Sequence, residues 1–363
     1  MPSSSAALRA NPAHDLLMQG LRPASPSVRE LKDKARRLAV HCAAYRGSIP
    51  GRAIVQLVST LALFTALIGL MFATVAHYYW ITLLLSVPAG GLLVRLFIIQ
   101  HDCGHGAFLK GRAANNLVGR FISVLTVTPY SVWAFEHAKH HATSGNLEER
   151  GIGDIDTLTV REYAALSRWR RRWYRLYRNP LFLFGFAVPF YFIFMQRLPH
   201  IHPLPRRVDA WNSVLGLNVA MVVFYGALGW IFGFWNMLFV ALPVIHIAAA
   251  TGGWLFFVQH QFEDTHWNRP PDWDGQVAAL FGSSYYVLPP VLNWFTGNIG
   301  LHHIHHLNSM IPNYRLMDCL KASPELQSLG RLTLWESLGC VRYKLWDEER
   351  RRMVTFKEAR AAV

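Results

Sequence analysis

The sequence predicts an all-α integral membrane protein with four transmembrane helices in two hairpins, interfacial helices and a cytoplasmic helical cap. Of its 363 residues, 52% are hydrophobic and only 16% are charged, which is too apolar for an ordinary soluble domain. Ala53–Ala76 contains no formal charge, and Ala210–Phe262 contains no Lys, Arg, Asp or Glu. Because about 20 apolar residues span the hydrocarbon core, the first stretch predicts one span and the second predicts two.

Residues 1–50 precede the first apolar run and are predicted to form a basic, loosely ordered cytoplasmic lead. They contain no short apolar core followed by a cleavage site, so they are not a secretory signal peptide. The acidic residues Asp15, Glu30 and Asp33 argue against a transit peptide. The membrane domain is then expected over residues 51–320, and a cytoplasmic helical tail over residues 321–363.

The remaining span of the first hairpin is predicted at Ile81–Gln100, where Arg95 is the single charge. The long stem of this arginine can reach the interface from about one turn inside the span. The two hairpin turns, His77–Trp80 and Gly229–Asn236, are uncharged, whereas Arg161–Arg178 contains seven arginines. The positive-inside rule therefore places the turns outside, and the arginines, lead and tail in the cytoplasm.

Two further apolar runs leave the number of spans open. Pro180–Gln196 is broken by Pro189 and carries positive charge at both ends, which favours an interfacial or re-entrant segment. Val277–Phe295 contains two adjacent prolines. If both runs crossed the membrane, six spans would still return the C-terminus to the cytoplasm. Four spans are the preferred interpretation.

Cysteine usage and net charge restrict the kinds of site and partner. The four cysteines lie far apart and form no CxxC motif, so neither a disulfide framework nor a thiolate zinc site is expected. The net charge of +14 comes from basic segments that flank the apolar runs. Positive-inside bias and attraction to anionic lipid explain such a distribution, so no nucleic-acid partner is expected.

Histidines cluster in three short windows at the edges of apolar segments. Nine of the 17 histidines fall within HDCGH (101–105), HAKHH (137–141) and HHIHH (302–306). A uniform distribution would place about 0.7 histidines in windows of this total length. On a helix, positions i, i+3 and i+4 share a face, so each window is expected to direct its imidazoles to one side. These patterns predict metal binding.

The ligand count indicates two metal ions rather than one. Two ligands from HDCGH and three from each of the other windows make eight, which is too many for one ion of four to six ligands. Imidazole suits iron, zinc, copper or nickel. Asp102 and Glu136 could accept the outer N–H of a ligating ring, or could be solvated surface carboxylates. Cys103 is interpreted as a small packing residue.

The sequence resembles the membrane-bound fatty acid desaturase family, and most of all its bacterial acyl-lipid and omega-6 branch. The resemblance rests on HDCGH, HAKHHATSGNLEERGIGDIDTLTVREY, FFVQHQFEDTHW and NWFTGNIGLHHIHHLNSMIPNY, and runs from about Ala53 to Tyr314. It implies a non-haem diiron centre of two iron ions. The implied ligands are His101, His105, His137, His140, His141, His302, His305 and His306, with His260 as a ninth.

Several neighbouring positions have weaker assignments. His303 falls at a variable position of the family motif, and His266 is a secondary candidate ligand. Asn298 could orient a ligand or a water, or could be a plain turn residue. His246, alone on an apolar helix, is expected to be a core residue of the bundle.

The resemblance implies a reaction that inserts a cis double bond into the acyl chain of a membrane lipid, with dioxygen and two external electrons. The sequence contains no cysteine cluster for iron and sulfur and no GxGxxG fingerprint, so a separate donor is expected. Ferredoxin is preferred over cytochrome b5, and the bacterial inner membrane is the expected location, with the active site on its cytoplasmic face. The alternatives are a hydroxylase, acetylenase or ketolase of the same superfamily, and a histidine-rich metal transporter.

Overall fold

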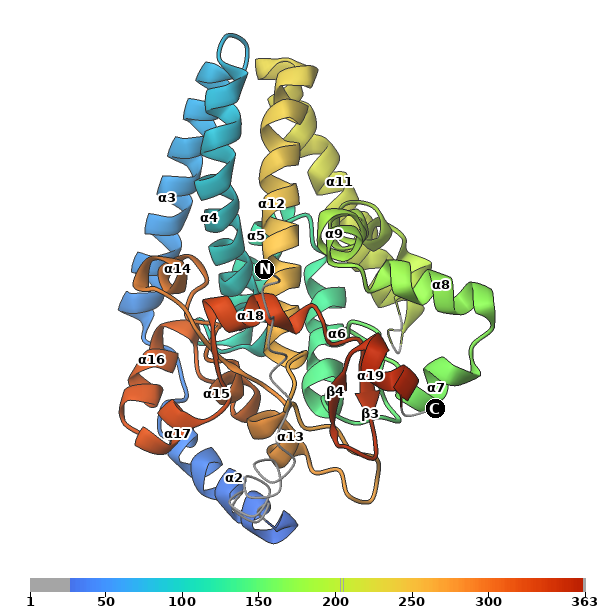
Figure 1. The fold of residues 1–363 in the computed structure, drawn as a ribbon. Coiled ribbons are helices and arrows are strands. Elements are labelled where there is room, and N and C mark those ends of the chain that lie inside the picture. Colours follow the sequence, from blue (N-terminus) through green and yellow to red (C-terminus); the bar gives the residue numbers. More distant parts are fainter. Residues whose placement is uncertain (1–26, 203, 205, 362–363) are drawn as a thin grey trace, which may run out of the picture.

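The computed structural model describes residues 27–202, 204 and 206–361. Four long helices, α3 (Pro50–Thr74), α4 (Tyr79–His105), α11 (Arg207–Phe232) and α12 (Phe234–His260), run side by side in two hairpins (Figure 1). Their most apolar windows have mean hydropathies between 1.8 and 2.1, as expected of membrane-spanning helices. The predicted all-α membrane fold and its two hairpins are confirmed.

Close packing holds the two hairpins together through α4, which lies between α3 and α12 (Figure 1). A Cβ atom added at Gly90 would lie 2.6 Å from the side chain of Ile247 on α12, so this crossing requires glycine. Along the same helix Leu92, Leu96 and Ile99 are buried in the core between the hairpins. The core therefore fixes the position of the end of α4, where HDCGH lies.

Arg95 does not lie near the end of its helix, because α4 continues for ten residues beyond it to His105. Its guanidinium donates to the Thr60 hydroxyl at 3.2 Å and to the carbonyl of Trp294, and lies 4.3 Å from the centre of the Trp294 ring. These contacts carry the guanidinium to the short helix α14 (Pro290–Phe295), so the arginine joins α3 and α4 to that helix.

The run Pro180–Gln196 lies across the direction of the four long helices (Figure 1). It is long and apolar enough to be a fifth candidate span by length and composition. However, it is assembled from α9 (Pro180–Phe182), the π-helix η1 (Leu183–Ala187), α10 (Val188–Ile193) and the 3₁₀ turn η2 (Met195–Arg197), and α9 is seen end-on in Figure 1. This orientation agrees with the predicted interfacial segment. The second ambiguous run is divided among α13 (Gly275–Phe281), strand β1 (Tyr285–Val287) and α14, so it is not one helix.

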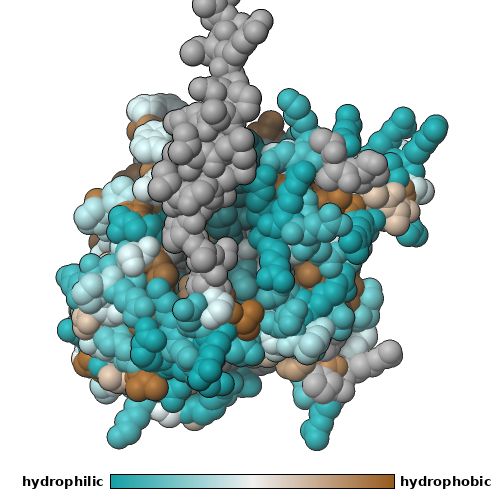
Figure 2. Space-filling model, turned by 60° about the horizontal axis from the view of Figure 1, so that its bottom comes forward, coloured by the Kyte–Doolittle hydropathy of each residue, from teal (hydrophilic) through white to brown (hydrophobic). Residues whose placement is uncertain are grey.

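The cap below the long helices consists of short helices and two small sheets. It includes α5 (Arg112–Leu125), α6 (Tyr130–Thr143), α7 (Val160–Ala165), the 3₁₀ turn η3 (Pro199–Ile201), α13, α15 (His302–Leu307), α16 (Asn313–Lys321) and α17 (Pro324–Ser328). The axes of α5 and α6 make an angle of 106°. Figure 2 shows that the visible underside of the cap is mainly hydrophilic.

The C-terminal segment is not an independent helical tail. Its strand β2 (Arg331–Thr333) pairs in parallel with β1, and its hairpin of β3 (Leu345–Asp347) and β4 (Arg352–Val354) is antiparallel. Helices α18 (Leu334–Cys340) and α19 (Phe356–Ala361) complete the segment. Since Trp346 is 1% exposed and bridges to Thr159, the segment packs against the rest of the chain.

The lead is also more ordered than the sequence suggested, from residue 28 onward. Helix α2 (Val28–Ala43) begins with a capping box in which Ser27 and Glu30 satisfy each other's backbone N–H groups. Ala35, Leu38 and Cys42 are buried along one face of α2 in a shared core with α13 and α15. Residues 1–26 of the predicted lead lie outside the described residues.

Exposed aromatic side chains mark two levels along the long helices. At the hairpin tips they include Trp80, which is 63% exposed, and Trp230, which is 91% exposed. The other level consists of α8 (Arg168–Tyr177), α9, α14 and α18, which lie at about mid-height of the molecule in Figure 1, near the cap ends of the long helices. Of these helices, α8, α14 and α18 carry exposed tryptophans, at 169, 173, 294 and 335. Aromatic belts of this kind lie at the two membrane–water interfaces. We call the second level the interfacial level; the cap lies beyond it.

Candidate metal centre

The nine predicted ligand histidines meet where the ends of the long helices enter the cap. They form two groups, in each of which the ring nitrogens offered as ligands lie within 4.8 Å of one another. The five-histidine group consists of His101, His105, His137, His141 and His305, and the four-histidine group of His140, His260, His302 and His306. Segments about 200 residues apart in the sequence therefore converge on one place.

The second and third windows are each divided between the two groups. His137 and His141, four residues apart on α6, enter the five-histidine group, while His140 points to the other group. On α15, His302 and His306 are four residues apart and enter the four-histidine group, whereas His305 enters the five-histidine group. The expectation that each window directs all its rings to one side is wrong, because adjacent helical positions are about 100° apart. The division places the groups side by side, and the rings of His141 and His306 stack at 4.0 Å.

The arrangement of ring nitrogens fits bound cations. The Nε2 atom of His141 lies 3.0 Å from that of His137 and 3.0 Å from that of His305. In the four-histidine group the Nε2 atom of His260 lies 3.1 Å from that of His140 and 3.0 Å from that of His302. A neutral Nε2 either donates or accepts, so convergent nitrogens cannot all be satisfied by one another. A metal ion can accept all their lone pairs.

Burial supports the same conclusion. His101 and His105 have buried Nε2 atoms without a hydrogen-bond partner among the described residues. An unsatisfied buried polar atom costs about 1–3 kcal/mol, which a bound ion would remove. Burial, followed by the neighbouring imidazoles, also holds the pKa values of His302, His305 and His306 well below the usual value. These rings are therefore neutral at physiological pH, as a nitrogen ligand must be.

Asp102 lies where a partner of a ligating ring is needed. Its Oδ1 atom accepts from Nδ1 of His101 at 2.9 Å. Its Oδ2 atom accepts from the backbone N–H of Asn313 at 2.6 Å and from the side-chain amide of Asn313 at 2.8 Å. Asn313 in turn accepts from Gln56 of α3 at 2.9 Å. This buried chain of hydrogen bonds fixes the His101 ring against three helices.

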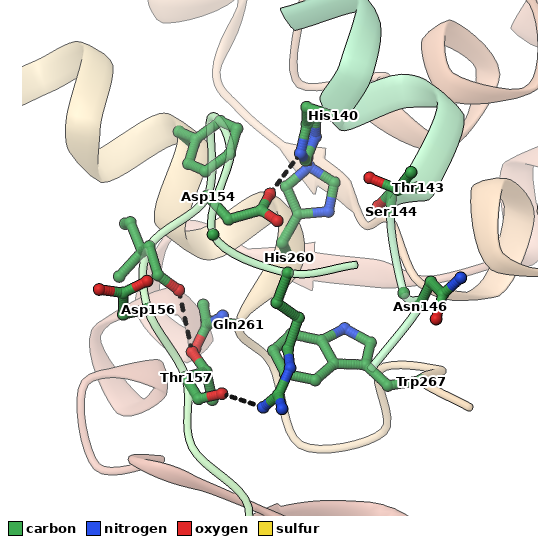
Figure 3. Close-up of a pocket in the computed structure, with 15 residues that line it drawn as sticks. His140, Thr143, Ser144, Asn146, Asp154, Asp156, Thr157, His260, Gln261 and Trp267 are labelled. Carbon is green, nitrogen blue, oxygen red and sulfur yellow. Dashed lines mark hydrogen bonds and ion pairs between the residues drawn. The ribbon is translucent and has the colours of Figure 1, made fainter. Parts of the chain in front are cut away.

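Asp154 makes the corresponding contact in the other group, and sequence reasoning missed it. Figure 3 shows its carboxylate directed at His140, whose Nδ1 atom lies 2.5 Å from Oδ1. Burial acts to raise the pKa of Asp154, but His140, His260 and the backbone N–H of Gly151 together leave the pKa below its usual value. Gly153 has a φ of +73°, and an added Cβ would lie 3.1 Å from the Glu136 carbonyl. This glycine lets the loop approach α6 closely enough for Asp154 to reach the ring.

Two predicted partners of the ligands have other roles. Glu136 accepts from Nδ1 of His202 at 2.8 Å, and the described residues show no hydrogen bond from it to a histidine of the two groups. Asn298 has a φ of +59° and donates from its amide to the Asn313 carbonyl at 3.4 Å, in the turn before α15. These contacts differ from those suggested by the sequence, because neighbouring positions on a helix or turn point in different directions.

The remaining histidines and Cys103 are outside the two groups. His303 is buried and its Nε2 atom lies 3.1 Å from the Leu326 carbonyl. His266 lies 3.0 Å from the Asn268 amide. Cys103 is buried in the core around α4, as predicted. His246 is exposed on α12, so its expected place in the bundle core is wrong.

A cavity of about 750 Å³ reaches the centre from the side of the interfacial segment. Its lining includes His101, His137 and His302 from the two groups. Most of the rest is apolar and comes from α4, α12 and the α9–α10 segment, with Phe97, Val188, Ala248, Gly252 and Phe256 among the residues that line it. The volume is typical of a site for a small organic ligand. The centre is therefore accessible to an apolar molecule from the membrane side.

Comparison with known proteins agrees with this arrangement. A sequence model of the family described as Fatty acid desaturase matches residues 76–337. A Bacillus subtilis protein named fatty acid desaturase is 40% identical over 324 residues, which are 89% of this chain and 91% of that protein. A Synechocystis sp. protein named sn-1 acyl-lipid omega-3 desaturase (ferredoxin) is 28% identical over 250 residues, or 64% of each chain.

A third relative extends the same pattern. An Anabaena variabilis protein named sn-1 oleoyl-lipid 12-desaturase is 25% identical over 260 residues, which are 69% of this chain and 71% of that protein. The family match and the 40% identity cover most of the chain and confirm the resemblance inferred from the histidine windows. The chain belongs to the fatty acid desaturase family.

Proposed function

We propose that this fatty acid desaturase binds one iron in each histidine group and inserts a cis double bond into the acyl chain of a membrane lipid. The observation that carries the proposal is that two adjacent all-imidazole groups line the inner end of a largely apolar cavity. Bound iron would supply the reductive activation of dioxygen that is needed to oxidise an unactivated methylene pair. The overall change takes one dioxygen, two electrons and two protons, and yields one double bond and two waters.

The residues of the chain perform the holding and positioning. The five-histidine and four-histidine groups hold the ions at neighbouring positions, and Asp102 and Asp154 fix the rings of His101 and His140 through their outer nitrogens. The apolar walls of the cavity exclude water and confine the chain next to His101, His137 and His302. The depth to which a chain can enter this cavity would then select the bond that is oxidised.

The acyl donor and the electron donor are proposed from the relatives and from the shape of the site. The relatives from Synechocystis sp. and Anabaena variabilis carry acyl-lipid and oleoyl-lipid in their names, and the former also carries ferredoxin. A cavity that opens beside the interfacial segment suits a lipid that never leaves the bilayer. We therefore assign a lipid-bound acyl chain, dioxygen and a separate ferredoxin-type donor as the reactants.

The membrane and its sidedness follow from charge. The arginine-rich α8 and the hydrophilic underside of the cap lie at one end of the four long helices, and the uncharged tips at the other (Figures 1 and 2). By the positive-inside rule the cap and the centre face the cytoplasm. We therefore propose the inner membrane of a bacterium as the location, with the centre on its cytoplasmic face.

The decisive experiment is the fatty acid profile of a host that lacks desaturase activity and expresses this chain. With saturated and monounsaturated fatty acids supplied, gas chromatography with mass spectrometry should reveal acyl chains with one new double bond in the membrane lipids, and a His302→Ala variant produced at the same level should yield none. Purified protein should contain about two irons per chain. An added oxygen or a triple bond in the product would instead identify a hydroxylase or an acetylenase, and labile zinc without turnover would identify a transporter.

A further inference from the structure

Helix α8 combines two side-chain rows that the proposed reaction leaves without a role. Arg168 and Arg172 are four residues apart and share one face, and Trp169 and Trp173 share the adjacent face. All four side chains are exposed, Trp169 by 73% and Trp173 by 57%. An exposed tryptophan row beside an arginine row is typical of a helix that lies in the membrane interface.

The guanidinium groups of this row are available to bind a ligand. Among the described residues, neither Arg168 nor Arg172 has a side-chain hydrogen bond or an ion pair with a carboxylate. The arginines on the inner side of α8 behave differently. Arg175 donates to the Tyr163 hydroxyl at 2.6 Å, and Arg171 donates to the Leu166 carbonyl at 2.9 Å. The outer row is therefore not needed to hold the helix in place.

The tryptophan row leads directly to the cavity. Trp173 and Tyr177 line the cavity from α8, and Phe182 continues the wall at a ring distance of 6.0 Å from Trp173. Phe186 and Phe190 extend this wall at successive ring distances of 5.4 Å. Phe186 both lines the cavity and is 54% exposed. The cavity thus reaches the lipid-facing surface along this row of rings, beside the outer arginines of α8.

We infer that Arg168 and Arg172 bind the phosphate of an anionic phospholipid whose acyl chain enters the cavity past Trp173. A phosphate is the group that pairs best with guanidinium, and its natural depth is the interfacial level at which α8 lies. The headgroup stays at the outer face of α8, while the tail passes the row of rings towards the two histidine groups. This inference rests on the proposed function, since it names the substrate lipid of that site.

The test compares two lipids and two pairs of arginines in the full-length, iron-loaded protein. Wild-type protein is reconstituted in nanodiscs whose lipids carry the same acyl chains on phosphatidylglycerol or on phosphatidylcholine. Binding of each lipid is measured separately by native mass spectrometry, and double-bond formation by mass spectrometry of the fatty acids. The variant R168Q/R172Q is compared with R29Q/R36Q, which removes two exposed arginines of α2 on the underside of the cap.

The wild type should prefer phosphatidylglycerol in both measurements. Each arginine near an anionic lipid surface strengthens binding about fivefold. R168Q/R172Q should therefore lower the preference for phosphatidylglycerol on the order of tenfold or more. R29Q/R36Q should leave it unchanged, and R168K/R172K should restore most of it. The inference would be overturned if R168Q/R172Q and R29Q/R36Q lost the lipid preference equally, or if the wild type showed no lipid preference.

Two other outcomes separate this inference from its alternatives. If phosphatidylglycerol binds selectively through Arg168 and Arg172 but neither lipid acquires a double bond, the proposed function fails while the lipid site stands. If R168Q/R172Q instead raises the KM for reduced ferredoxin and leaves the lipid preference intact, α8 docks the electron donor and the lipid site is refuted.

Discussion

The two histidine groups share α6 and α15, but α4 completes the five-histidine group and α12 the four-histidine group, and the two are supported differently. The five-histidine group rests on α4, and its Asp102 lies within the helix that also carries His101 and is buried against Asn313. The four-histidine group depends on Asp154, which comes from a loop and reaches His140 only because Gly153 lets that loop approach. One group is positioned by helical spacing, whereas the other needs a long-range contact that no local pattern contains.

The difference in ligand number gives the largest expected effect. The four-histidine group has no spare ligand, so His302→Ala should remove about one iron per chain and lower double-bond formation by more than about a hundredfold. Such a loss exceeds the 10- to 100-fold that partners of ligands usually cost. His105→Ala leaves four imidazoles in its group and should retain more iron. Iron analysis and product yield of both variants, normalised to folded protein, test this order, and equal losses would contradict it.

The supporting carboxylates should have intermediate effects that differ in kind. Asp154→Asn and Asp102→Asn should each weaken metal binding by about 10- to 100-fold. Only Asp102→Asn should also lower the melting temperature of the metal-free protein, because Asp102 accepts two buried hydrogen bonds from Asn313. Chelator titration gives the metal affinity and thermal unfolding gives the stability. A loss of stability in Asp154→Asn as large as that in Asp102→Asn would show that the loop is as deeply embedded as α4.

Gly153→Ala should have a smaller effect that acts through Asp154. A non-glycine residue at a φ of +73° costs about 1–2 kcal/mol, and its Cβ would press on the Glu136 carbonyl. The loop should shift and weaken the contact with His140, so metal affinity falls a few-fold, by less than in Asp154→Asn. Since both changes act on one contact, the double variant should be little worse than Asp154→Asn alone. Additive losses in chelator titrations would indicate a separate role for Gly153.

The same contrast explains what the sequence could predict. The long helices could be predicted because uncharged runs of about 20 residues have few alternatives to spanning a membrane. The ligands could be predicted because histidines four residues apart share a helix face. The contact of Asp154 with His140 joins a loop to a helix, and that of Glu136 with His202 joins α6 to the residue that follows η3. Helical periodicity carries no information about such pairs, so the sequence suggested only neighbouring positions as partners of the ligands; of these, Asp102 contacts a histidine of the two groups, whereas Glu136 and Asn298 bond elsewhere.

The local structure of α2 and of the C-terminal segment was hard to predict for a related reason. Helix α2 is mainly polar, and its apolar face gains stability only by packing against α13 and α15, which are more than 200 residues away in the sequence. Strand β2 has three residues and exists because β1 provides its partner. Short elements have weak propensities of their own, so tertiary contacts decide their structure.

His303 offers the smallest expected effect on the metal and the sharpest test of the two groups. It lies between two proposed ligands in HHIHH, yet its ring faces away and its Nε2 atom is paired with the Leu326 carbonyl at 3.1 Å. His303→Ala leaves that buried carbonyl without its partner, which should cost about 1–3 kcal/mol of stability. The melting temperature should therefore fall while the iron content stays at the wild-type value, unlike in His302→Ala. Loss of an iron in His303→Ala at a temperature where the protein remains folded would mean that ligation does not follow the two groups.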